Sequence, residues 1–223
     1  MDDGEHGAAW PARLYLWAAD RLYHEFAWAY DAVSWLVSLG RWSHWRRQAL
    51  AQVEGRRILE IGFGTGDLLA EMAGHGRRVA GLEPSPAMQR VAACKLRRRG
   101  LAVARLRGVA QALPFTAGAF DTVVATFPAP YILAAETWQE AARVLRPGGR
   151  LVIAGLFVEA DAPLPPWLGP KGEAERVERR LRELAARAGF SLTVHREEGA
   201  RWRSPVFVME KPGNPPAPVE DER

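Results

Sequence analysis

A glycine loop between an apolar run and a helical pattern is the feature that most constrains the fold. The run Ile58-Leu59-Glu60-Ile61 leads into Gly62-Phe63-Gly64-Thr65-Gly66, and a helix is predicted to begin near Asp67. Glycines at such a point let the chain turn tightly and let a ligand approach the backbone. In an open α/β sheet this loop lies at the carboxyl end of a strand, where ligands bind. The segment therefore predicts a ligand-binding α/β domain.

Short apolar runs alternate with helical patterns on both sides of the loop. This alternation predicts a mostly parallel sheet with helices on both faces. The predicted strands are residues 57–61, 78–82, 102–106, 122–126, 150–156, 190–196 and 202–210, and the predicted helices are 67–73, 86–99, 136–145 and 173–188. The segment Pro147-Gly148-Gly149 is predicted to be a turn before the strand at 150.

The chain divides into three predicted regions. Residues 1–54 contain six of the nine tryptophans and apolar positions near helical spacing, which indicates an N-terminal helical cap. Residues 55–211 form the predicted ligand-binding domain. Residues 212–223 contain four prolines and no core-forming run, so this tail is expected to be disordered.

Cysteine count and charge exclude several classes of protein. A single cysteine, Cys94, cannot form an intramolecular disulfide and argues against a cysteine-ligated metal, so no metal is expected. Without a secretory signal, a cytoplasmic location is expected. All but three of the 30 basic residues are arginines, but the net charge is only +4, which favours a solvated arginine-rich surface over nucleic-acid binding. The most apolar stretch, residues 26–39, is interrupted by Asp31 and is shorter than a spanning helix.

The spacing of the glycines selects the ligand. They occupy the first, third and fifth positions of the loop, whereas the dinucleotide fingerprint needs the first, third and sixth. Asp67 stands sixth, where an anionic pyrophosphate would meet the helix N-terminus. No Gly-Lys-Ser/Thr closes the loop, which excludes a P-loop. The expected ligand lacks phosphate and tolerates acidic neighbours, and S-adenosylmethionine fits because it carries an ammonium, a sulfonium and a ribose diol.

Two glutamates are predicted to hold this ligand. Glu60 ends the first strand and is expected to bind the ammonium side. Glu83 ends the second strand, 21 residues after Gly62, where an acid accepts hydrogen bonds from ribose hydroxyls. The alternative for Glu83 is a surface turn in Glu83-Pro84-Ser85-Pro86.

Four segments in order resemble the class I S-adenosylmethionine-dependent methyltransferases. They are Glu60–Gly66, Gly81–Met88, Gln111–Phe115 with Phe120-Asp121, and Arg143–Gly149. The resemblance implies a Rossmann-like seven-stranded sheet with the last strand antiparallel. It also implies a set of cofactor-binding residues, namely Glu60, Gly62, Phe63, Gly64, Gly66, Glu83, Pro84, Ser85, Met88, Ala110, Gln111 and Phe127. Many relatives have an aspartate after the glycine that corresponds to Gly108, and Val109 replaces it in this chain.

The N-terminal region is similar to that of the ubiquinone/menaquinone biosynthesis C-methyltransferases. Tyr30–Ser34 and Ser38–Arg47 carry this similarity, which implies that the cap covers the cofactor and forms part of the acceptor pocket. The expected partner is a small lipophilic acceptor, with a quinone-ring carbon first and transient contact with a membrane surface. N-methylation of a phospholipid or small amine, and a non-catalytic binding module, remain alternatives. A nicotinamide-dependent oxidoreductase is disfavoured by Asp67.

No catalytic group is assigned. Methyl transfer from a sulfonium is an in-line displacement that chiefly requires alignment, and a base is needed only if the nucleophile must lose a proton. The catalytic candidates are His44, as a base toward a phenolic acceptor, and Tyr131, which is expected to line the pocket, and each has an ordinary structural role as its alternative. The segment 126–131 lacks the polar opening residue typical of methyltransferases for nucleic-acid bases. The sequence does not indicate an oligomeric state.

Overall fold

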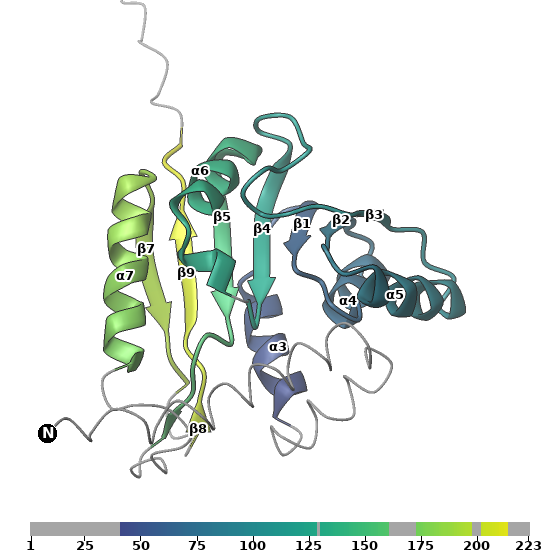
Figure 1. Ribbon diagram of the computed structural model, residues 1–223, viewed down its shortest axis with the longest axis horizontal. Coiled ribbons are helices and arrows are strands. Elements are labelled where there is room, and N and C mark those ends of the chain that lie inside the picture. Colours follow the sequence, from purple (N-terminus) through teal and green to yellow (C-terminus); the bar gives the residue numbers. More distant parts are fainter. Residues whose placement is uncertain (1–40, 129, 161–172, 198–201, 214–223) are drawn as a thin grey trace, which may run out of the picture.

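The computed structural model describes residues 41–128, 130–160, 173–197 and 202–213 (Figure 1). The helices in these ranges are α3 (Trp42–Ala51), α4 (Asp67–Gly74), α5 (Pro86–Arg98), the 3₁₀ helix η2 (Pro130–Leu133), α6 (Ala135–Val144) and α7 (Glu173–Arg187). The strands are β1 (Arg57–Ile61), β2 (Arg78–Leu82), β3 (Ala104–Leu106), β4 (Phe120–Thr126), β5 (Leu145–Ala154), β6 (Glu159–Ala160), β7 (Ser191–His195), β8 (Trp202–Arg203) and β9 (Val206–Glu210).

Seven of these strands form one sheet in the order β3-β2-β1-β4-β5-β9-β7. Pairing is parallel from β3 to β5, whereas β9 is antiparallel to both β5 and β7. The carboxyl ends of the parallel strands therefore share one edge, at the bottom of Figure 1. This arrangement confirms the predicted Rossmann-like, mostly parallel sheet whose last strand is antiparallel.

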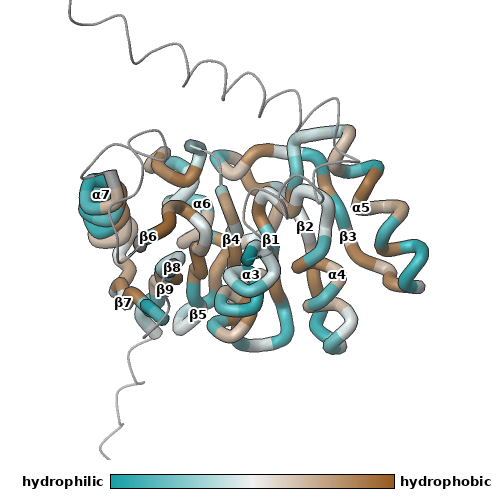
Figure 2. The backbone as a smooth tube through the Cα atoms, turned by 90° about the horizontal axis from the view of Figure 1, so that it is seen from below, coloured by the Kyte–Doolittle hydropathy of each residue, from teal (hydrophilic) through white to brown (hydrophobic). Residues whose placement is uncertain are grey.

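Helices cover both faces of the sheet, as expected for strands that are buried on both sides. On one face, Ala49 of α3 and Leu68 and Met72 of α4 pack against Val124 and Val152. On the other face, a larger cluster joins residues of α6 and α7, including Trp138 and Leu184, to the sheet. Figure 2, which looks onto the carboxyl edge, shows α3 and α4 on the opposite side of the sheet from α6 and α7.

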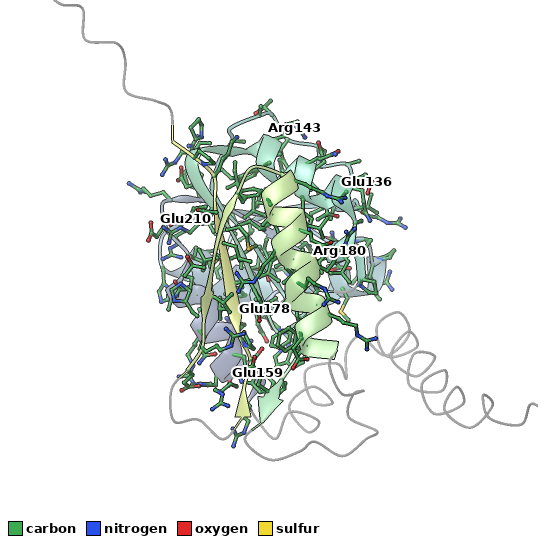
Figure 3. The ribbon with its side chains drawn as sticks, turned by 90° about the vertical axis from the view of Figure 1, so that its left-hand side faces the viewer. Glu136, Arg143, Glu159, Glu178, Arg180 and Glu210 are labelled. Carbon is green, nitrogen blue, oxygen red and sulfur yellow. The ribbon has the colours of Figure 1, made fainter. Side chains whose placement is uncertain are left out.

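An ion-pair network joins α7 to the outer strands. The Arg196 guanidinium donates to the carboxylates of Glu178 in α7 and Glu159 in β6, and β6 pairs with β8. Figure 3 shows Glu178 and Glu159 toward the same end of α7. Exposed pairs of this kind contribute little each, so the buried apolar stripe of α7 accounts for most of its attachment.

The main differences from the predicted elements concern the start of β5, the strand predicted at 202–210 and one short pair of strands. β5 begins at Leu145, and the predicted turn at Pro147-Gly148-Gly149 lies within it as an irregularity, because the pairing with β4 jumps from Phe120↔Leu145 to Thr122↔Arg150. The predicted strand 202–210 is broken into β8 and β9, where Pro205 has no N–H to donate. The pair β6–β8 was not predicted.

Several predictions concern residues outside the described ranges. Of the predicted N-terminal cap, the structure describes only α3, which buries Trp45 and Ala49. The tail beyond residue 213 also lies outside, and the three-region division remains a prediction. In the described part of the chain, no helix is both long and apolar enough to cross a membrane.

Candidate active site

A cavity of about 100 Å³ opens at the carboxyl ends of β1 and β4. Three stretches of the chain line it: α3, the end of β1 with the glycine loop, and the segment after β4. The lining residues are Trp42, Arg46, Glu60, Gly62, Phe63, Gly64, Thr65, Asp67, Leu68, Thr126, Phe127, Pro128 and Tyr131. The structure thus brings together Glu60, Gly62, Phe63, Gly64 and Phe127 of the predicted cofactor residues.

Glu60 presents a buried carboxyl to this cavity. Its side chain is 2% exposed, and Oε2 has no hydrogen-bond partner among the described residues. Burial raises the pKa of Glu60 well above its usual value, Arg46 opposes the rise, and the charges of Asp67 and Glu83 add to it. A buried acceptor that lacks a partner is costly, and a ligand cation removes that cost. Glu60 therefore fits the ammonium group of S-adenosylmethionine.

The glycine loop leaves its backbone open to a ligand. Gly62, at φ +71°, passes so close to Tyr131 that a Cβ would lie 2.7 Å from the hydroxyl oxygen. Gly64, at φ +52°, has no atom within 4 Å of the position of a Cβ. Gly62 is therefore required for packing, and Gly64 for an open approach to the main chain.

Glu83 fixes the loop to the end of β2. Its side chain is fully buried, Oε2 accepts the Gly64 N–H at 3.0 Å, and Oε1 accepts the Ser85 N–H at 2.8 Å. Glu83 does not line the cavity, and the ribose role expected for it remains a prediction.

The other predicted cofactor residues lie outside this cavity. The Ser85 hydroxyl caps α5 by accepting the Met88 N–H at 3.4 Å, and Met88 is buried. Pro84 and Gln111 are exposed, whereas Gly66 and Ala110 are buried. Val109, which replaces the expected aspartate, is 50% exposed. The roles expected for these positions remain predictions.

Two stacked aromatic rings form a wall of the cavity. The rings of Trp42 and Phe127 lie 3.5 Å apart with an interplanar angle of 15°. Phe127 has φ +51°, and no other non-glycine residue of the described segments has a positive φ. Its ring occupies the space where a Cβ on Gly155 would stand, 2.2 Å from the nearest ring atom. Such strain costs about 1–3 kcal/mol and is typical of functional sites.

The two catalytic candidates have different surroundings. The Tyr131 hydroxyl donates to the Ile61 carbonyl at 3.2 Å, and burial, with the charges of Glu83 and Glu60, raises its pKa. Tyr131 therefore stays protonated and serves as a wall and a donor. His44 does not line the cavity, and its Nε2 lies 2.8 Å from the Glu197 carboxylate. Trp42 and Arg46, four residues apart, share the face of α3 that lines the cavity, and His44 is on the other face.

Sequence reasoning missed Trp42 and Arg46 as lining residues, although their spacing on a helix was a usable signal. It also counted Asp67 among the acidic neighbours of the ligand. In the structure Asp67 contacts Lys95 Nζ at 2.6 Å and Arg46 Nη1 at 3.2 Å. The acidic character of the cavity therefore comes chiefly from Glu60.

Known proteins resemble this chain in sequence and in fold. Residues 59–153 match the family described as a methyltransferase domain. The demethylmenaquinone methyltransferase of Lactiplantibacillus plantarum is 34% identical over 169 residues, which cover 71% of this chain and 69% of that protein. The chain belongs to the class I S-adenosylmethionine-dependent methyltransferases. The family and its cofactor are those that the sequence motifs indicated.

Further comparisons define the extent of the likeness. The demethylmenaquinone methyltransferase of Thermus thermophilus is 40% identical over 139 residues, which cover 59% of this methyltransferase and 63% of the relative. The match to that of Beutenbergia cavernae covers 58% of the relative, so the chain spans about three fifths of the length of these two proteins. The geranyl diphosphate C-methyltransferase of Streptomyces coelicolor has the same fold, with a TM-score of 0.60, 14% identity, and coverage of 76% of this chain and 79% of that one.

Proposed function

We propose that this methyltransferase transfers the methyl group of S-adenosylmethionine to a small lipophilic acceptor, and that the first candidate for the accepting atom is a quinone-ring carbon. The observation that carries the proposal is the cavity in which Glu60 Oε2, which has no hydrogen-bond partner in the described part of the chain, faces the same space as the Trp42–Phe127 stack. The side of the cavity that carries Glu60 suits a cation, and the side formed by Trp42 and Phe127 suits a planar apolar ring. The demethylmenaquinone methyltransferases among the relatives support the choice of a ring carbon.

We assign the cofactor end of the reaction to the side of the cavity that carries Glu60 and the glycine loop. S-adenosylmethionine supplies an electrophilic methyl group on its sulfonium. Glu60 accepts hydrogen bonds from the ammonium group, and the open backbone at Gly64 admits the chain of the ligand. Tyr131, held against Ile61 and Gly62, closes the space beside the loop. These residues orient the methyl group and exclude water, which are the main requirements of an in-line displacement.

We assign the acceptor end of the reaction to the aromatic wall formed by Trp42 and Phe127. Phe127 follows β4 directly, and Trp42 covers its ring from α3, so a flat acceptor has a rigid apolar surface on which to align. Ring stacking contributes about 0.5–1.5 kcal/mol beyond the area that it buries. We place the protein in the cytoplasm with transient contact at a membrane surface, where a lipophilic quinone is available.

Separate incubations with two acceptors test this proposal. Labelled S-adenosylmethionine is supplied with a demethylated menaquinol or with phosphatidylethanolamine, and products are identified by mass spectrometry. Label on the quinol ring carbon is expected. Label on the amine alone would replace the proposal with N-methylation, and cofactor binding with no transfer to either acceptor would indicate a binding module.

A substitution in the wall separates the two ends of the site. Trp42→Leu should raise the KM for the acceptor by about tenfold, the equivalent of roughly 1.4 kcal/mol of lost stacking. The dissociation constant for S-adenosylmethionine should change by less. Arg47→Gln, an exposed position on the same helix, is the matched control, and an equal effect of both variants on the acceptor would contradict a role for the wall.

A further inference from the structure

A second cavity lies at the opposite edge of the sheet, where the parallel strands begin. Its volume is about 500 Å³, and its lining residues are Gly55, Arg56, Arg57, Arg78, Asp121 and Arg146. We call these four arginines with Asp121 the arginine basin. Arg57 and Arg78 are register partners on β1 and β2, while Asp121 and Arg146 belong to β4 and β5. Methyl transfer at the other edge makes no use of this basin.

Asp121 organises the basin. Its Oδ2 accepts the backbone N–H groups of Arg56 and Arg57, each at 2.9 Å, and its Oδ1 accepts Arg57 Nη2 at 2.9 Å and Arg146 Nε at 2.8 Å. Partial burial opposes ionisation, but the bonds from Arg57, Arg56 and Arg146 outweigh it and hold the pKa of Asp121 well below its usual range. The four donors match the roughly four acceptor positions of a carboxylate. Asp121 is therefore fully engaged in positioning two of the guanidinium groups.

The local backbone is built around this carboxylate. Gly55 has φ +77°, and a Cβ there would lie 2.4 Å from Asp121 Cβ, so only glycine lets the chain turn this closely into β1. The turn directs the N–H groups of Arg56 and Arg57 toward Asp121. The basin is thus a fixed feature of the sheet edge and does not depend on long, freely rotating side chains alone.

The basin has more positive charge than its own residues balance. Four guanidinium groups against one carboxylate leave a net charge of +3 on the lining residues. Among the described residues, the guanidinium groups of Arg56 and Arg78 have no hydrogen bond or ion pair, and the nearby Glu54 binds Arg150 at 2.6 Å. Like charges gathered at one edge repel each other, and a multivalent anion relieves that repulsion.

We propose that the arginine basin binds a multiply charged phosphate group. Guanidinium groups match phosphate oxygens with paired hydrogen bonds, and each such bond is stronger than one between neutral groups. A diphosphate has the charge that the basin leaves unbalanced, and either a soluble diphosphate or a cluster of phospholipid headgroups presents this chemistry. Because the basin and the methyltransferase cavity lie at opposite edges of the sheet, the two sites bind independently.

Calorimetric titration with inorganic pyrophosphate tests the proposal on the full chain. Arg56→Gln with Arg78→Gln should weaken binding at least tenfold, and should leave the thermal midpoint and the affinity for S-adenosylmethionine unchanged. Arg97→Gln with Arg98→Gln, two exposed positions of α5, removes the same charge elsewhere and should weaken binding less than twofold.

Flotation with phosphatidylglycerol vesicles identifies the source of the phosphate. Loss of vesicle binding in the Arg56/Arg78 variant, without measurable pyrophosphate binding by the wild type, assigns the basin to lipid headgroups. Pyrophosphate binding without flotation assigns it to a soluble ligand. The absence of both, or an equal loss in the two double variants, overturns the proposal.

Discussion

Glu60 combines two opposing properties at the scale of a single residue. Its burial favours the neutral form, and the cation that it is proposed to bind favours the charged form. Arg46 offsets only part of this burial, and Oε2 accepts no hydrogen bond from the described residues. The folded protein is therefore destabilised at a position that its ligand would stabilise, which is a common relation between stability and function.

Glu60→Gln should change both the stability of the protein and its affinity for S-adenosylmethionine. The amide removes the buried acid, so the protein should unfold at a higher temperature at neutral pH. Binding of S-adenosylmethionine should weaken by about 10–100-fold, because a hydrogen bond to a charged group contributes about 1.5–3 kcal/mol. Thermal unfolding and calorimetric titration measure the two effects, and Glu136→Gln, an exposed position of α6, is the control. Unchanged affinity would remove Glu60 from the cofactor site.

The affinity for S-adenosylmethionine should rise with pH. In the free protein the pKa of Glu60 is raised, chiefly by burial, so protons occupy it at acidic pH, and a bound ammonium group favours the ionised form. Binding then releases a proton, and affinity increases until the pH exceeds the raised pKa of the free carboxyl. Titrations at several pH values in buffers of different ionisation enthalpy measure this release. A flat profile that Glu60→Gln does not alter would contradict it.

The residues that the sequence indicated depend on local spacing, whereas those that it did not indicate depend on contacts between positions far apart in the sequence. Glu60, Gly62 and Gly64 line the cavity as expected, because their positions follow from local spacing after a strand, whereas their roles stay predictions. The pairing of Asp67 with Lys95 depends on how α4 meets α5, and the placement of His44 against Glu197 joins positions 153 residues apart. Neither contact leaves a local signal in the sequence.

At the scale of elements, the carboxyl ends of β4 and β5 support the aromatic wall together. The Phe127 N–H donates to the Ala154 carbonyl at 2.7 Å, and Gly155 leaves room for the Phe127 ring. The strained backbone of Phe127 is maintained because the neighbouring strand and Trp42 both restrict it. The wall is thus a property of two adjacent strand ends and one helix.

Gly155→Ala should destabilise the protein by about 2–5 kcal/mol. It adds the cost of a positive φ to the collision with Phe127, and these contribute about 1–2 and 1–3 kcal/mol. Gly76→Ala is the matched control, because Gly76 also has a positive φ but has nothing within 4 Å of a Cβ. Chemical denaturation measures both, and equal losses would mean that Phe127 moves aside freely.

The bounds of helices and strands were predicted accurately where an apolar run and the turn residues that flank it indicated the same limits. β1 and β2 have the predicted bounds, and α4 and α5 end within one residue of theirs. The predicted start of β5, at residue 150, was too late in the sequence. Proline and glycine normally mark a turn, whereas this strand includes them in an irregular pairing with β4. The short β6–β8 pair involves too few residues for a periodic pattern.

At the scale of the whole molecule, the two edges of the sheet at which the parallel strands begin and end carry different charges. The carboxyl edge gathers a buried acid and aromatic rings, and the opposite edge gathers arginines around Asp121. Through Arg57 and Arg146, Asp121 also links β1, β4 and β5, which are the central strands of the fold.

Asp121→Asn should destabilise the whole sheet by about 2 kcal/mol at neutral pH, since hydrogen bonds to a charged group are lost or weakened. The pKa of Asp121 is lowered in the folded protein, so its contribution is complete above the unfolded value of about 3.9 and declines as the pH falls below it. Denaturation at pH 7 and near pH 3 should therefore show a difference between the variant and the wild type that shrinks in acid. A difference that persists unchanged would attribute the effect to packing.

The position of β9 determines when the enzyme can become complete during its synthesis. Of the described strands, β9 is synthesised last, yet it lies between β5 and β7, and Lys211 just beyond it donates to the Ala142 and Leu145 carbonyls. Until translation has passed residue 210, one side of β5 has no neighbour and β7 has nothing to pair with. A chain that stops before Val206 would therefore leave the backbone N–H and C=O groups on one side of β5 unpaired, and such a strand can pair with another chain.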